Sequence, residues 1–149
     1  MSFASSQTAP ARTEGHVDTA LAPYAIFGLR LAAGALFLAH AGLKIFVFTP
    51  AGTAQFFASL GLPPTLAYVT ILWELLGAAA LILGVWPRVA AAALVPVLMG
   101  AIVTVHGPAG FWFTNPHGGW EYPAFWAFVL VALAALGDGA YVLKRTPLR

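Results

Sequence analysis

Residues 65–106 read TLAYVTILWELLGAAALILGVWPRVAAAALVPVLMGAIVTVH, and this stretch decides the fold. Two apolar runs, residues 65–86 and 88–106, are joined through Pro87 alone. At about 1.5 Å per residue, each is close to the ~30 Å thickness of bilayer hydrocarbon. Neither run alternates apolar and polar residues as a barrel strand does. The stretch therefore predicts a tight antiparallel pair of transmembrane helices.

Two further apolar runs, residues 23–47 and 122–143, flank this pair. The 149 residues are 60% hydrophobic and 8% charged, against about 25% charged residues in an ordinary soluble domain. We therefore predict an all-α fold: one integral membrane bundle of four helices over residues 22–145. The glycines of Gly137-Asp138-Gly139 mark a point where the fourth helix can break.

The connections and the N-terminal tail differ from these runs. Residues 1–21 are polar and are predicted to be a disordered cytoplasmic tail. Residues 55–60 predict a short interfacial helix after the first span. The connection before the fourth span is rich in Phe, Trp and Tyr, which favour the membrane–water interface.

The basic residues predict the orientation. With four spans, both termini and the second connection share one side, and that side carries most of the Lys and Arg residues. These are Arg12, Arg88, Lys144, Arg145 and Arg149, against Lys44 alone on the other side. The positive-inside rule then predicts a bacterial cytoplasmic membrane protein with cytoplasmic N- and C-termini.

The composition also excludes classes of function. The chain has no cysteine, which removes thiolate nucleophiles, disulfides and Fe–S ligation by Cys. Its net charge of +2 comes without a basic stripe, so no nucleic-acid partner is expected. The expected surroundings are the lipid bilayer.

Ionisable residues inside a span are costly and by default indicate function. On the first apolar run, His40 and Lys44 lie about 80° and 40° around the helix from Arg30, so all three share one face. Counting ~1.5 Å per residue from the cytoplasmic side gives similar heights for five groups. These groups are His40, Lys44, Glu74, His106 and Glu121, whereas Arg30 lies deeper.

We predict His40, Glu74, His106 and Glu121 as catalytic candidates, and Arg30, Lys44 and Trp120 as substrate-binding candidates. Each also has a structural interpretation. The two cations can snorkel to the interfaces, Glu74 can form a structural ion pair with Arg30 or Lys44, and Glu121 can stabilise a helix N-terminus. Convergence of five groups at one height favours a functional site.

Several short motifs, taken in order, resemble the DoxX family. They are HAGLKIF at 40–46, FASLGLP at 57–63, ELLG at 74–77, TVH at 104–106 and GGWEYP at 118–123. The resemblance covers residues 25–141. It implies a four-helix membrane protein associated with oxidoreductase systems, including defence against oxidants, quinones and thiol stress.

Three hypotheses of function stay open. The first is a quinone-interacting redox protein, or a membrane subunit of an oxidoreductase system, in which His and Glu exchange protons and Lys44 or Arg30 stabilises an anion. Its electrons require a cofactor or a partner protein, because no residue here carries them.

The second hypothesis is a metal or haem site built from the His and Glu residues, which the nearby cations disfavour; no metal ligand is assigned. The third is a non-enzymatic scaffold or small-solute carrier, which would need oligomerisation to act as a transporter. A homo-oligomer fits any of the three.

Overall fold

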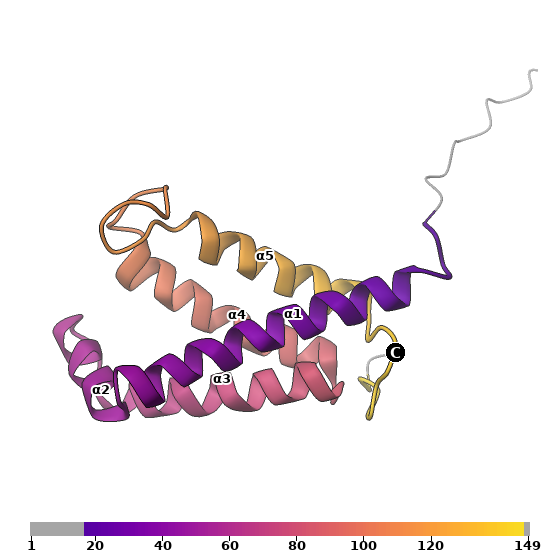
Figure 1. Cartoon of the computed structure of the whole chain (residues 1–149), viewed down its shortest axis with the longest axis horizontal. Coiled ribbons are helices and arrows are strands. Elements are labelled where there is room, and N and C mark those ends of the chain that lie inside the picture. The colour runs from indigo at the N-terminus through magenta and orange to yellow at the C-terminus, as the bar shows by residue number, and fades with distance from the viewer. Residues whose placement is uncertain (1–16, 148–149) are drawn as a thin grey trace, which may run out of the picture.

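The computed structural model describes residues 17–147. These residues form a helical bundle (Figure 1) whose elements are, in chain order, α1 (Ala22–Gly42), η1 (Leu43–Val47), α2 (Pro50–Ser59), α3 (Thr65–Leu83), α4 (Pro87–Ala101), η2 (Ile102–His106) and α5 (Glu121–Leu136). Both η1 and η2 are π-helical and continue the α-helix before them. Of the tail expected to be disordered, residues 1–16 lie outside the described part of the chain.

Three helical segments of the described chain are long and apolar enough to cross a membrane: Ala22–Val47, Thr65–Leu83 and Pro87–His106. Helix α5 has 16 residues, or about 24 Å at the helical rise. The run that predicted it continues to residue 143, but the helix ends at the Gly137-Asp138-Gly139 break. Gly137 has φ +116° and Gly139 has φ +76°, conformations that glycine adopts without a steric penalty.

The α3–α4 hairpin is as tight as predicted. Gly84 ends α3 in the left-handed conformation at φ +70°, the usual role of glycine after a helix. Trp86 is also left-handed, and Pro87 is the first residue of α4, where its missing N–H costs nothing. The short helix predicted over residues 55–60 is present as α2, but it begins earlier, at Pro50, and ends at Ser59. The hydroxyl of Thr49, just before α2, accepts a hydrogen bond from Gly52 N at 3.1 Å.

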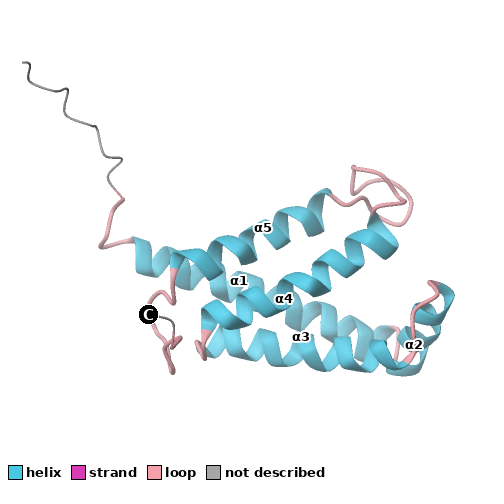
Figure 2. Cartoon of the chain, turned by 180° about the vertical axis from the view of Figure 1, so that it is seen from behind, coloured by secondary structure: helices cyan, strands magenta, loops and turns pink. Residues whose placement is uncertain are grey.

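The helices pack as two pairs, α1 along α3 and α4 along α5. The pairs meet at the α3–α4 turn and splay apart toward α2 and the 107–120 loop, in both opposite views (Figures 1 and 2). Small residues allow α1 and α3 to approach closely. A Cβ added to Gly34 would lie 3.1 Å from the carbonyl oxygen of Ala78.

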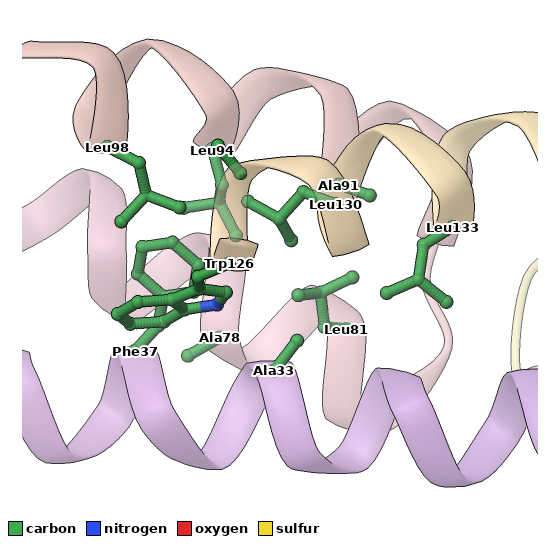
Figure 3. Close-up of a cluster of buried hydrophobic side chains, with 11 residues drawn as sticks. Ala33, Phe37, Ala78, Leu81, Ala91, Leu94, Leu98, Trp126, Leu130 and Leu133 are labelled. Atoms are coloured by element: carbon green, nitrogen blue, oxygen red, sulfur yellow. The ribbon is translucent and has the colours of Figure 1, made fainter. Parts of the chain in front are cut away.

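One apolar core joins all four long helices where the pairs are close (Figure 3). Phe37 of α1, Leu81 of α3, Leu94 of α4 and Leu130 of α5 are almost completely buried in it. On the side toward the splayed end, the rings of Phe37 and Trp126 pack at a centroid distance of 4.3 Å. The core therefore holds one end of the bundle together and leaves the other end free to enclose a cavity.

The segment after α5 folds back against the end of the bundle that carries the α3–α4 turn, and its carbonyl groups bind the buried Arg30. Arg30 donates from Nη1 to Asp138 O at 2.8 Å and from Nη2 to Tyr141 O at 2.8 Å, with a longer bond to Ala140 O at 3.2 Å. The arginine side chain is completely buried. Further along, Lys144 pairs with Val85 in an isolated β-bridge, so this segment closes the end of the bundle that carries the α3–α4 turn.

Candidate functional site: a cavity between the splayed helix pairs

A cavity of about 620 Å³ lies between the splayed pairs. Its lining comes from α1, η1, α2, α3, α4, η2, α5 and the loops beside α2, and is mostly aliphatic and aromatic. Pockets of about 300–1,000 Å³ with apolar walls and a few polar groups are typical of small-molecule sites. In the described chain, the charged or imidazole side chains that line it are those of His40, Lys44, Glu74 and His106.

Lys44 and Glu74 form an ion pair at the cavity wall. The Lys44 ammonium contacts both carboxylate oxygens of Glu74, at 2.9 Å and 2.8 Å. The Glu74 side chain is 4% exposed and that of Lys44 is 19% exposed. Glu74 therefore pairs with Lys44, one of the two partners that the sequence suggested for it.

Two of these four residues lie on the π-helical segments. Lys44 belongs to η1 and His106 ends η2. A π-turn carries an extra residue and rotates the residues after it around the helix axis, and such turns often occur at functional sites. The hydroxyl of Thr53 in α2 donates to the Lys44 carbonyl at 3.2 Å, which ties α2 to the widened turn.

The geometry around His106 fixes one ring nitrogen. Nδ1 lies 2.9 Å from the carbonyl oxygen of Gly118, so it must carry the proton and donate. In a neutral imidazole, Nε2 is then an acceptor. Nε2 makes no hydrogen bond to the described residues, so a ligand in the cavity can use it. Gly118 has φ +69°, a conformation glycine adopts easily.

His40 belongs to an aromatic wall of the cavity. Its ring packs 5.3 Å from that of Trp126, and the ring of Tyr122 is 5.9 Å from Trp126 on the same helix. Flat aromatic walls suit a flat ligand ring, because aromatic pairs gain from offset or edge contacts beyond their buried area.

Three predicted residues lie elsewhere. Arg30 binds the segment after α5 through its three carbonyl contacts. The Glu121 carboxylate accepts a hydrogen bond from Phe113 N at 2.9 Å and borders a separate hollow with Phe113 and Phe125. Trp120 packs its ring 4.8 Å from Phe111 within the 107–120 loop. The structure thus brings together His40, Lys44, Glu74 and His106, and leaves these three apart.

Sequence reasoning missed two tryptophans of the cavity, Trp73 and Trp126. Trp73 precedes Glu74 on α3 and donates its indole N–H to Ala93 O of α4 at 2.8 Å. Apolar runs in membrane proteins contain many aromatic residues, so only their position on the cavity side distinguishes these two. The one signal in the sequence that could have found Trp73 is its position next to Glu74, in the middle of the second apolar run.

The described residues contain no group of three or more His, Asp or Glu side chains that could hold a metal ion. Within the cavity, the acid among the four residues is Glu74, and it is occupied by Lys44. This donor set does not fit a metal centre, since such a centre needs several free carboxylate or imidazole ligands.

Taken together, a helical bundle with three membrane-length helices, around a cavity lined by a few ionisable groups, defines a polytopic membrane protein with an internal cavity. The family model of DoxX matches residues 25–107, which is more than half of the chain, and the protein belongs to the DoxX family. The matched region contains His40, Lys44, Glu74 and His106, whereas α5 lies after it.

A protein of Bacillus subtilis (strain 168) named "Putative oxidoreductase CatD" is 40% identical over 83 residues. This alignment covers 56% of the present chain and 60% of the relative. The chain thus matches less than two thirds of that relative's length. No solved structure matches the chain.

Proposed function

We propose that this protein binds a quinone in the main cavity and handles its protons as part of a membrane oxidoreductase system. The observation that carries the proposal is the convergence of His40, the Lys44–Glu74 pair and His106 on one apolar cavity. A quinone is a flat, apolar ring with two carbonyl acceptors, which matches aromatic walls and a few donors. The name of the Bacillus relative, "Putative oxidoreductase CatD", supports the same class of chemistry.

The residues present can do two things for such a ligand. The Lys44 ammonium can donate to a quinone carbonyl and stabilise negative charge that develops on its oxygen. Histidine exchanges protons near neutral pH, and His40 or His106 can supply or accept the proton of a quinol hydroxyl. Reduction of a quinone to a quinol consumes two electrons and two protons; this site would supply the protons.

The electrons come from elsewhere in this proposal. The chain contains no cysteine, so no thiol of its own can deliver them. A redox partner protein, membrane-bound or peripheral, would carry the donor cofactor. Within the proposal the protein lies in the bacterial cytoplasmic membrane with both termini in the cytoplasm, and its role is oxidant, quinone or thiol-stress defence.

Binding of a quinone to the purified protein in lipid nanodiscs tests the proposal directly. Trp73 and Trp126 line the cavity, so a bound quinone should quench tryptophan fluorescence with saturation. His106→Asn keeps a donor near the position of Nδ1 and removes Nε2, and we expect it to weaken binding about tenfold. His117→Asn is the matched control, because His117 lies in the loop and outside the cavity lining.

Saturable quenching that His106→Asn weakens and His117→Asn does not would support the proposal. Quenching that rises linearly with quinone, or equally in all three proteins, would contradict it.

A second candidate function, a non-enzymatic scaffold, is favoured by one observation. The two oxygens of Glu74 are both occupied by Lys44, which is the geometry of a structural pair. Under this alternative, a well-folded Glu74→Gln variant restores oxidant or quinone tolerance fully in a deletion strain. Under the quinone proposal, Glu74→Gln accumulates normally in the membrane and fails to restore tolerance.

A further inference from the structure

The main cavity is open on the side between α3 and α4. Val69 on α3 and Pro96 and Gly100 on α4 all line the cavity, and all three are exposed at the molecular surface. Phe56 of α2 and Tyr122 of α5 also line the cavity and are exposed, at the splayed end of the bundle. Exposed lining residues on the two neighbouring helices α3 and α4 mark an opening between these helices. Because both helices are membrane-length and apolar, this opening faces lipid rather than water.

The opening has a defined base. The Trp73 indole N–H donates to the carbonyl oxygen of Ala93 at 2.8 Å and bridges the two helices. Trp73 lies eight residues after Thr65, so the bridge sits about 12 Å along α3 from its start. From this bridge, the helices diverge toward α2 and the 107–120 loop (Figures 1 and 2). This opening between α3 and α4, which we call the slot, thus lies within the depth of the hydrocarbon.

The walls of the slot differ from the rest of the cavity. Its edges are apolar side chains and a glycine, whereas Lys44 lies on η1 and His106 on η2. A single or fused quinone ring at the ionisable groups would leave much of the 620 Å³ unfilled. Apolar volume that continues from a polar pocket to the lipid suits a ligand with an apolar chain.

We infer that the ligand carries an apolar chain and enters laterally from the bilayer between α3 and α4, with its ring at His40, Lys44–Glu74 and His106 and its chain in the slot above Trp73. The inference rests on the proposed function and specifies its substrate class: chain-bearing, lipid-resident quinones rather than water-soluble ones.

Gly100 provides the test. A Cβ built at Gly100 meets no atom within 4 Å, so Gly100→Phe can be accommodated and would place a ring in the slot. Gly28 on α1 likewise has no atom within 4 Å of an added Cβ and does not line the cavity. Gly28→Phe is therefore a matched control for the change of a helical glycine to phenylalanine.

The experiment compares two probes with the same ring: menadione, which has no chain, and a menaquinone with a prenyl chain. Binding is measured by tryptophan quenching in nanodiscs, with ligand expressed as its fraction in the lipid, and thermal unfolding checks that each variant is folded. We expect Gly100→Phe to weaken binding of the prenylated probe about tenfold and to leave menadione binding nearly unchanged. Gly28→Phe should bind both probes as the wild type does.

Equal weakening of both probes by Gly100→Phe, or no effect on either, would overturn the placement of the chain in the slot, and with it lateral entry between α3 and α4, while the quinone site itself stands. Failure of the wild type to bind either probe would overturn the proposed function and the inference together. If Gly100→Phe does not fold, Gly100→Leu replaces it, with Gly28→Leu as its control and the same expected results.

Discussion

At the scale of single residues, the Lys44–Glu74 pair allows stability and function to be separated. Lys44→Met leaves the Glu74 carboxylate buried without its partner, and breaking a buried pair in this way costs about 3–5 kcal/mol. The double variant Lys44→Met/Glu74→Gln removes both charges and should recover most of that loss. Thermal unfolding in detergent measures both, and equal loss in the single and double variants would show that the pair contributes nothing to stability.

The same double variant also bears on chemistry. If it folds like the wild type and still binds a quinone with wild-type affinity, neither Lys44 nor Glu74 takes part in binding. We expect it to fold and to lose binding, because the cavity then keeps its apolar walls and loses its cationic donor.

Arg30 is the second residue whose role can be separated by substitution. Its guanidinium donates to carbonyl oxygens of Asp138, Ala140 and Tyr141, and a lysine ammonium cannot reproduce this fork. Arg30→Lys should lower the free energy of unfolding by about 2–4 kcal/mol, since hydrogen bonds to charged groups contribute about 1.5–3 kcal/mol each. Unfolding in detergent measures the loss, and protease cleavage after residue 141 should become faster.

Quinone binding by Arg30→Lys should equal that of the wild type, because Arg30 does not line the cavity. The exposed Arg145 gives the control, Arg145→Lys, for which no change is expected. A stable Arg30→Lys protein that has lost quinone binding would instead support the substrate-binding role that the sequence suggested.

At the scale of elements, the π-helical turns position the site. Removing one residue from η2 should convert it to α-helix and rotate His106 by about 100° around the axis. Val103 is the residue to delete because its side chain is 69% exposed and makes little packing. We expect the variant to keep its helical circular dichroism and to lose quinone binding.

If the deletion variant instead binds a quinone as well as the wild type, the π-turn has no role in placing His106. The His106→Asn variant then decides whether the imidazole itself matters.

The elements were largely predictable from the sequence, and their contacts only in part. Apolar run length predicts four spans, of which three are membrane-length helices in the structure and the fourth, α5, is shorter. Counting the rise per residue places Glu74 near the level of His40 and Lys44. Height along the helix axis does not determine which way a side chain turns. Glu121 was therefore expected with the four residues of the cavity, whereas its carboxylate binds Phe113 N of the 107–120 loop and does not line the cavity. The partners of Arg30 are carbonyls of a non-helical segment, and no periodicity in the sequence encodes them.

At the scale of the whole molecule, the predicted orientation can be tested without background labelling, because the chain has no cysteine. Thr114 lies in the loop between η2 and α5, and Pro147 lies near the opposite end of the bundle; both are exposed. An impermeant maleimide should label Thr114→Cys in intact bacterial cells, and Pro147→Cys only after the membrane is opened. The reverse pattern would invert the proposed orientation.

The hydrogen bonds of Arg30 to the segment after α5 also set an order of events during synthesis. Arg30 leaves the ribosome more than a hundred residues before its acceptors, since Asp138 and Tyr141 are 108 and 111 positions further along the chain. While the chain is being made, the guanidinium on the first span has none of these carbonyls to bind and must remain with water or lipid headgroups. The end of the bundle that carries the α3–α4 turn can therefore close only once the helices before it have been inserted. A chain truncated before residue 138 would leave Arg30 without these acceptors and expose it to quality-control proteases.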